Sequence, residues 1–300
     1  MMRKLNVVAG LMLLALALLC VTLPGLDAEA VQAVDATVFV PVRVTDSKNV
    51  PVTSLKLEHF QLSEENKEQK LTYFSGPGDP MTLGVVVQLS ASGPVKAAGQ
   101  RDRITVDILG AVDRVREAAT PGPAILDQLP LDSDAIYPMM AKNIAALSQS
   151  PGKRKALVVV GDGLIASGSR AEAMQLPKSL IETARLASFP VYFLFAVTSL
   201  PEPALTEGSA YAVGNSLDQI ATATGGQTVV GQIENNLASN ATVLRDRLKA
   251  QYVLGYTSTN PAKEGKWRKL TVKVTPPDSQ LKVKIDAKKQ YFVAKADGGN

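Results

Sequence analysis

The chain has 300 residues, of which 46% are hydrophobic and 20% are charged, and its formal net charge is +4 at pH 7. This composition suffices for a packed core and excludes wholesale disorder, and the small positive balance leads us to expect no nucleic-acid partner. One cysteine, Cys20, and one histidine, His59, exclude a disulfide framework, a cysteine-rich zinc site and a multi-histidine metal centre within one chain.

Residues 1–30 have the features of a secretory signal peptide. Two basic residues precede an apolar run over residues 5–19, and an Ala-x-Ala pattern ends at Ala30. We therefore expect a secreted or periplasmic protein that is cleaved near Ala30. Two alternatives stay open. One is an uncleaved membrane anchor, which would make the membrane a partner. The other is a lipoprotein modified at Cys20, which the preceding leucine disfavours.

Residues 31–78 are predicted to supply the first strands of a β-sandwich. Valine at every second position over residues 38–44 indicates a strand. Pro41 cannot donate a hydrogen bond to a neighbouring strand, so it predicts an edge strand or a bulge. Two further strands are expected on either side of a polar turn at residues 64–66.

Residues 79–250 change to a pattern typical of a parallel α/β domain. Short apolar runs suit strands that are buried on both faces of such a sheet, and they lie at residues 83–89, 156–160 and 191–197. Four stretches with apolar residues at helical spacing alternate with these runs, around Ile108, Ala184, Ile220 and Leu244. Alternation of strands and helices predicts right-handed crossovers in a doubly wound sheet.

Residues 251–296 return to an alternating pattern. Leu270, Val272 and Val274 are separated by polar residues, as are the apolar residues at 281, 283 and 285. Neither flanking β segment has enough strands to be stable alone. We therefore expect residues 31–78 and 251–296 to pair into one small antiparallel β-sandwich, with residues 79–250 inserted between them and residues 297–300 as a tail.

Four lysines on these last strands allow two interpretations. They are Lys269, Lys273, Lys282 and Lys284. A charged outer face on alternating strands is the ordinary explanation, and it also prevents edge-to-edge aggregation. The alternative is a basic stripe that binds an anionic lipid or polysaccharide.

Three motifs in the chain match a known pattern. They are His59-Phe60 with Glu64-Glu65-Asn66, then Arg154-Lys155-Ala156-Leu157-Val158-Val159-Val160-Gly161-Asp162-Gly163, and finally Gln251-Tyr252-Val253-Leu254-Gly255-Tyr256. In these motifs the chain resembles the VWFA-related domain proteins of the acidobacterial type, over roughly residues 38–292. The resemblance implies a von Willebrand factor A-like domain that binds rather than catalyses. The stretch between Ser92 and Lys153 is short for this fold, so one sheet edge is expected to be trimmed.

The resemblance also implies a metal-ion-dependent adhesion site at the carboxyl edge of the sheet. In the family, Asp-x-Ser-x-Ser follows the first strand, and later loops add a threonine and an aspartate as oxygen ligands for Mg²⁺. Here Gln88, Ser90 and Ser92 match the first motif, Asp162 matches the later aspartate, and Asp134 is nearest to the threonine position. Because Gln88 replaces an aspartate, the site loses a full negative charge. We expect a degenerate site without a cofactor, and Mg²⁺ would bind only if Asp134 compensated.

Two classes of function follow from these observations. The first is an exported, non-catalytic adhesion or assembly module that binds an unidentified protein at the cell envelope through loops at the carboxyl edge of the sheet. The second is a cell-envelope hydrolase that uses Ser90 or Asp162 at the same cleft. The absence of the usual catalytic side-chain combinations from the sequence favours the first, so we expect a protein that is not an enzyme.

Overall fold

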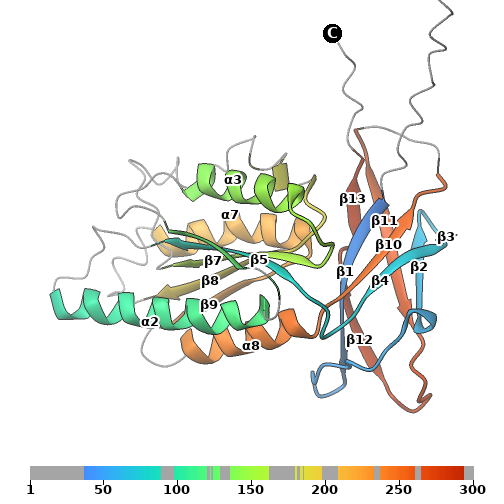
Figure 1. Ribbon diagram of the computed structural model, residues 1–300, viewed down its shortest axis with the longest axis horizontal. Coiled ribbons are helices and arrows are strands. Elements are labelled where there is room, and N and C mark those ends of the chain that lie inside the picture. The colour runs from blue at the N-terminus through green and yellow to red at the C-terminus, as the bar shows by residue number, and fades with distance from the viewer. Residues whose placement is uncertain are drawn as a thin grey trace, which may run out of the picture. The chain divides into compact units, whose positions relative to one another are not determined.

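The computed structural model describes residues 37–88, 98–119, 122, 124–128, 136–161, 180, 183–184, 186–197, 209–232, 237–260 and 265–293. The predicted signal peptide and tail lie outside these residues. The described residues form one parallel sheet and two antiparallel sheets (Figure 1). This confirms the predicted class, mixed α/β with a parallel sheet and antiparallel strands.

The parallel sheet has five strands in the order β6-β5-β7-β8-β9. Their bounds are β5 (Thr82–Gln88), β6 (Ala124–Gln128), β7 (Lys155–Gly161), β8 (Val191–Val197) and β9 (Thr228–Gln232). Every neighbouring pair runs parallel. All residues of β5 and β7 are buried, because helices cover both faces of the sheet. The three apolar runs of the sequence therefore correspond to β5, β7 and β8.

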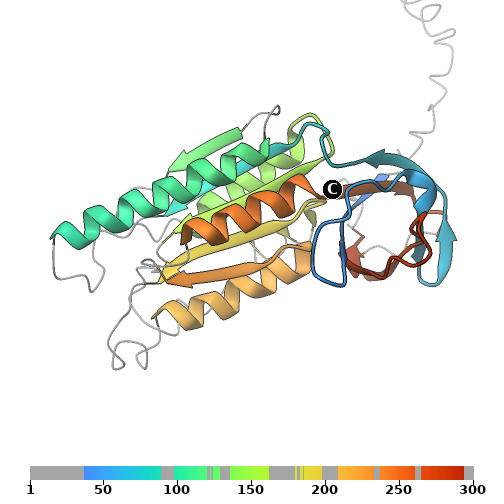
Figure 2. The same cartoon turned by 90° about the horizontal axis from the view of Figure 1, so that it is seen from below.

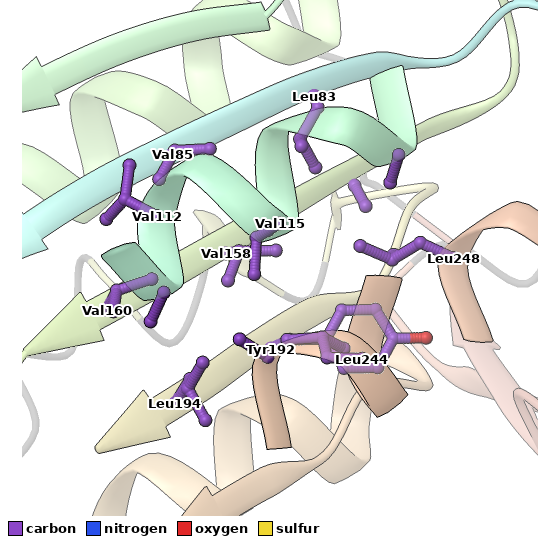
Figure 3. Close-up of a cluster of buried hydrophobic side chains, with 14 of the residues drawn as sticks. Leu83, Val85, Val112, Val115, Val158, Val160, Tyr192, Leu194, Leu244 and Leu248 are labelled. Atoms are coloured by element: carbon purple, nitrogen blue, oxygen red, sulfur yellow. The ribbon is translucent and has the colours of Figure 1, made fainter. Parts of the chain in front are cut away.

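Helices α2 (Ala98–Arg116) and α8 (Leu237–Lys249) cover one face, and α3 (Ile136–Gln149) and α7 (Ser209–Thr224) cover the other (Figures 1 and 2). The short helix η3 (Glu117–Ala119) follows α2. Figure 3 shows the first interface, in which Val112, Val115 and Leu244 of the helices belong to one buried cluster with Val158 and Leu194 of the strands. Two apolar cores thus enclose the sheet, one on each face.

Helix α3 begins two residues after Asp134, the residue nearest to the expected threonine position. Its first residue, Ile136, is fully buried. Pro138 does not interrupt this helix, because it lies in the first turn, where a backbone N–H has no intrahelical partner. The buried ammonium of Lys155 donates hydrogen bonds to carbonyl groups at the other end of α3, at 2.5 Å to Leu147 and 2.7 Å to Ser150.

The two antiparallel sheets combine strands from both ends of the chain. One sheet has the order β12-β1-β10-β4 and the other β13-β11-β2-β3. The strands before the parallel sheet are β1 (Thr37–Asp46), β2 (Phe60–Glu64), β3 (Lys67–Gln69) and β4 (Leu71–Ser75), with helix η2 (Leu57–His59) between β1 and β2. The strands after it are β10 (Tyr252–Thr257), β11 (Trp267–Val274), β12 (Val283–Ala287) and β13 (Gln290–Phe292). Strand β1 pairs with β10 and β2 pairs with β11.

The two antiparallel sheets share one apolar core, so they form a sandwich. Val42 and Leu254 from the first sheet pack with Leu62 and Leu270 from the second. The aromatic ring of Tyr252 lies 5.1 Å from that of Phe60 between centroids, and its hydroxyl donates a hydrogen bond of 2.8 Å to the Val52 carbonyl. Packing of aromatic rings and a satisfied hydroxyl are what a buried tyrosine requires.

Strand β1 corrects one expectation. Pro41 predicted an edge strand or a bulge, but β1 lies between β12 and β10, and its pairing with both neighbours is regular. The proline is tolerated because β12 pairs only with residues 42–46, so at Pro41 the strand has a partner on the β10 side alone.

Among the described residues, no helix is long and apolar enough to cross a membrane.

Candidate functional site

The strand order of the parallel sheet identifies one place where a ligand is expected. From β5 the chain crosses to β6 on one side, and from β6 it crosses back to β7 on the other side. The order therefore reverses between β5 and β7. In open α/β sheets, ligands bind beyond the carboxyl ends of the strands at such a reversal. The carboxyl ends of β5 and β7 are Gln88 and Gly161.

Gln88 and Gly161 lie side by side at this edge. They are register partners across the β5–β7 pair, and Gln88 is buried. A Cβ atom added at residue 161 would lie 2.8 Å from the Gln88 carbonyl oxygen and 2.9 Å from Oε1 of its side chain. Such contacts are too short, so only glycine fits beneath the Gln88 side chain.

The other four predicted site residues lie outside the described residues. Ser90 and Ser92 follow the end of β5, and Asp162 directly follows Gly161. Asp134 belongs to the connection that leaves β6 and enters α3. The sequence positions of all five residues thus fall in or next to connections that start at the carboxyl edge. The structure shows the placement of Gln88 alone.

Gln88 limits the chemistry of this edge. Its neutral amide offers one acceptor oxygen and two donor hydrogens, but no charge and no proton to exchange near neutral pH. The described residues contain no group of three or more His, Cys, Asp or Glu side chains that could hold a metal ion. The Mg²⁺ site therefore stays a prediction, since four of its five residues lie outside the described part of the chain.

The sandwich contains a buried ionic cluster that the sequence analysis missed. Glu64 is fully buried, and Arg268 donates to its carboxylate at 2.5 Å. Tyr256, Ser258 and Tyr291 donate to the same carboxylate at 2.8–3.0 Å. The sequence placed Glu64 in a polar turn. The turn itself is observed, with positive φ angles at the two residues after Glu64, but Glu64 belongs to β2 and faces the core.

These hydrogen bonds keep Glu64 ionised. Burial alone would raise the pKa of Glu64, but the hydrogen bonds from Tyr256 and Arg268 outweigh burial and the pKa is lowered. A signal for this residue was present in the sequence. Phe60, Leu62 and Glu64 alternate along one strand, so period two places all three on the same buried face.

Arg154, just before β7, is a second buried charge that sequence reasoning missed. Its guanidinium donates to the carbonyl of Asp79 at 2.5 Å, to those of Leu248 and Lys249 at 2.7 Å each, and to that of Gln251 at 3.2 Å. Two of these acceptors lie at the carboxyl end of α8, where the helix dipole favours a cation. Burial lowers the pKa of Arg154. The residue lies at the amino end of β7, away from the candidate edge.

Lys288, between β12 and β13, is the third buried charge. Only 5% of the residue is exposed, and its ammonium donates a hydrogen bond of 3.0 Å to the Ala187 carbonyl. Burial lowers the pKa of Lys288 to about 8. The sequence did not distinguish Lys288 from the exposed Lys282 and Lys284, because all three stand at every-second positions of the same alternating pattern.

Comparison of the chain with models of known protein families and with curated protein sequences finds no match. The likeness to VWFA-related proteins therefore rests on the motifs of the sequence alone.

Proposed function

We propose that this protein is an exported, non-catalytic binding module whose parallel sheet is a von Willebrand factor A-like domain trimmed at one edge. Its partner is a protein at the cell envelope, bound by the loops at the carboxyl edge. The observation that carries this proposal is the reversal of strand order between β5 and β7, with Gln88 and Gly161 at the ends of these strands.

Gln88 supports binding without a metal ion. A hard cation such as Mg²⁺ gains most of its affinity from charged oxygen ligands. Gln88 occupies the position that the resemblance gives to the first aspartate, it carries no charge, and its side chain packs against Gly161. Recognition at this edge then rests on shape and on hydrogen bonds, which suit a protein surface.

The proposal is tested by cross-linking from the predicted edge. A photoreactive side chain at position 90 captures partners from the envelope fraction, and the same group at position 67, on an exposed residue of β3, is the matched control. We expect one reproducible partner from position 90 that is absent from position 67. The combined variant Ser90→Ala, Ser92→Ala, Asp162→Ala should bind this purified partner at least tenfold more weakly, a loss of about 1.4 kcal/mol.

Two outcomes would overturn the proposal. Capture of the same proteins from both positions would mean that the edge has no specific partner. Turnover of a substrate by the unmodified chain that the triple variant abolishes would favour the hydrolase instead.

A thermal melt tests the loss of metal dependence. With EDTA, and then with excess Mg²⁺, Mn²⁺ or Ca²⁺, we expect the same melting temperature for the unmodified chain. An ion at a hundred times its dissociation constant would stabilise the fold by about 2.7 kcal/mol, a shift on the order of 5–10 °C for a chain of this size. A shift of that size that Asp162→Ala removes would show that the metal site is intact and that this part of the proposal is wrong.

A further inference from the structure

A groove of about 890 Å³ lies along one edge of the sandwich and is partly walled by α8. Two runs of consecutive residues line it, 269–272 of β11 and 284–289 of β12 and the turn that follows. Successive side chains of a strand point to opposite faces. Consecutive lining residues therefore mean that the edges of these strands, with their backbone N–H and C=O groups, border the groove.

Both strand edges are open there because the chain changes sheets. Residues 283–287 pair with β1, and residues 290–292 pair with residues 267–269 of β11 (Figure 1). Where the chain passes from β12 to β13, the Leu270 N–H of β11 donates a hydrogen bond of 2.7 Å to the Lys289 carbonyl. We call this point, at which the two sheets part, the fork. Beyond it, β11 pairs with β2 alone and β12 with β1 alone among the described strands. The two sheets separate at this point and each leaves one edge unpaired.

The charge of the groove is strongly positive. Its lining includes six basic residues: Arg43, Arg247, Lys269, Lys284, Lys288 and Lys289. The lining also includes two acidic residues, and each is already paired, Asp286 with Arg43 at 2.6 Å and Asp246 with Arg245 at 2.8 Å. Among the described residues, Arg247 and the groove lysines form no ion pair with a carboxylate.

Ile285 adds an apolar contact surface and corrects an expectation. Its place in the alternating pattern predicted a buried side chain, but Ile285 is 37% exposed and lines the groove. Val283 and Ala287, two residues before and after it on the same strand, pack against the sandwich core. Val243 of α8 is also exposed and lines the groove. The groove lining thus combines exposed apolar side chains with basic ones, which we call its basic rim.

We propose that this groove binds an extended, acidic segment of a partner polypeptide, which pairs as an added strand with the open edge of β12. A concave groove fits a single extended chain, whereas a lipid bilayer presents a flat surface. Open strand edges favour a polypeptide over a polysaccharide, because only a polypeptide offers N–H and C=O groups at the spacing of a strand. The basic rim selects acidic side chains. The surface is separate from the carboxyl edge of the parallel sheet, so this inference does not depend on the proposed function.

The test uses the full chain and a short labelled peptide in which glutamate alternates with valine. We expect binding that weakens as salt rises, since Lys269, Lys284 and Lys289 are exposed and screened by ions. The double variant Lys269→Glu, Lys284→Glu should lower the affinity on the order of tenfold, because it replaces attraction by like-charge repulsion. The matched control is Lys67→Glu, Lys70→Glu, which makes the same change of net charge at exposed lysines on and beside β3, at the other side of the sheet.

A second peptide of the same sequence with methylated backbone nitrogens separates strand pairing from charge alone. It cannot donate to β12, so we expect it not to bind. Hydrogen exchange should slow at residues 284–287 when the unmodified peptide binds, and should stay unchanged in β3. Equal binding of the two peptides, equal binding by the groove variant and the control, or binding of a sulfated polysaccharide with none of the acidic peptide would each overturn the proposal.

Discussion

The parallel-sheet region and the sandwich bury charged side chains in different ways. Strands β5 and β7 are buried at every position between two apolar cores, and the buried cations Arg154 and Lys155 donate to backbone carbonyl groups. The sandwich has an apolar core as well, but it also encloses an ion pair of side chains, the carboxylate of Glu64 and the guanidinium of Arg268. One region rests mainly on apolar surface buried on two faces of a sheet, and the other adds a cluster of side chains that must be complete.

This difference decides how each region responds to change. Apolar packing is non-directional, so a truncated side chain costs transfer free energy and a cavity, and the remaining residues keep their partners. A buried ionic cluster is directional, so removal of one member leaves the others uncompensated. In the parallel sheet, the loss of stability should therefore grow with the side-chain volume removed. In the sandwich, the loss of a single charged or hydrogen-bonding atom of the cluster should be enough to lower stability.

The largest effect is expected in the parallel sheet. Phe193 is fully buried in β8 and stacks on Phe195 with 5.8 Å between ring centroids. Phe193→Ala should lower the free energy of unfolding by about 3–5 kcal/mol, measured by urea unfolding. Leu186→Ala, at a leucine that is 55% exposed, is the control and should change stability little. A small loss at Phe193 would contradict an apolar origin of stability in this region.

Glu64→Gln tests the polar cluster of the sandwich. The variant keeps the size of the side chain but removes the carboxylate charge that faces the buried guanidinium of Arg268, which should cost about 3 kcal/mol. Because the folded-state pKa of Glu64 is lowered from 4.5, its stabilisation is present above that pH and is lost as the pH falls through the folded pKa. Unfolding curves at several acidic pH values should show this loss in the unmodified chain and not in Glu64→Gln. Glu68→Gln, at an exposed residue of β3, should retain the pH dependence.

Lys288 should give an effect of the same sign with pH as Glu64, but in the alkaline range. Its pKa is lowered from 10.5 to about 8 in the folded chain, so between these values the unfolded chain binds more protons and stability rises with pH. At 1.36 kcal/mol per pKa unit the rise is about 3 kcal/mol. Unfolding measured from neutral to alkaline pH should show the rise in the unmodified chain and in Lys289→Met, at the exposed neighbour. Its persistence in Lys288→Met would assign it to another group.

The smallest effect is expected at the surface ion pair of the same sandwich. Arg43 and Asp286 approach to 2.6 Å, but the Asp286 side chain is 66% exposed. Asp286→Asn should cost less than about 1 kcal/mol and less still at high salt. A double-mutant cycle with Arg43→Met measures the pair directly. A coupling as large as that between Glu64 and Arg268 would remove the distinction between buried and exposed pairs drawn here.

The sequence predicted the parallel sheet better than the sandwich edges, for a physical reason. A strand that is buried on both faces must be apolar throughout, so the runs at 83–89, 156–160 and 191–197 identified β5, β7 and β8 nearly to the residue. Strand β9 was not identified, because Thr228–Gln232 is short and contains glycine and glutamine. The exposure of Ile285 depends on where the two sheets of the sandwich part. The alternating pattern of apolar residues around Ile285 does not show where that point lies.

The candidate site could be predicted only in part. Gln88 was identified because the resemblance aligns it with the aspartate of Asp-x-Ser-x-Ser, and the structure places it at the end of β5, where the strand order reverses. Glu64 could have been found from its period with Phe60 and Leu62. Arg154 could not, because its four acceptors are backbone carbonyls that are far apart in the sequence and leave no pattern of residue types.

Arg154 has a consequence for the order of folding. It holds the Asp79 carbonyl, where the chain leaves the sandwich, and the Gln251 carbonyl, where the chain returns. For the sandwich strands, residues 79–251 are a long loop whose closure alone would cost roughly 4–5 kcal/mol of chain entropy. Once the parallel sheet has formed and Arg154 has joined its two ends, that loop is already closed. The sandwich strands then meet as if a short turn connected them, so the inserted segment acts as a template for the strands on either side of it.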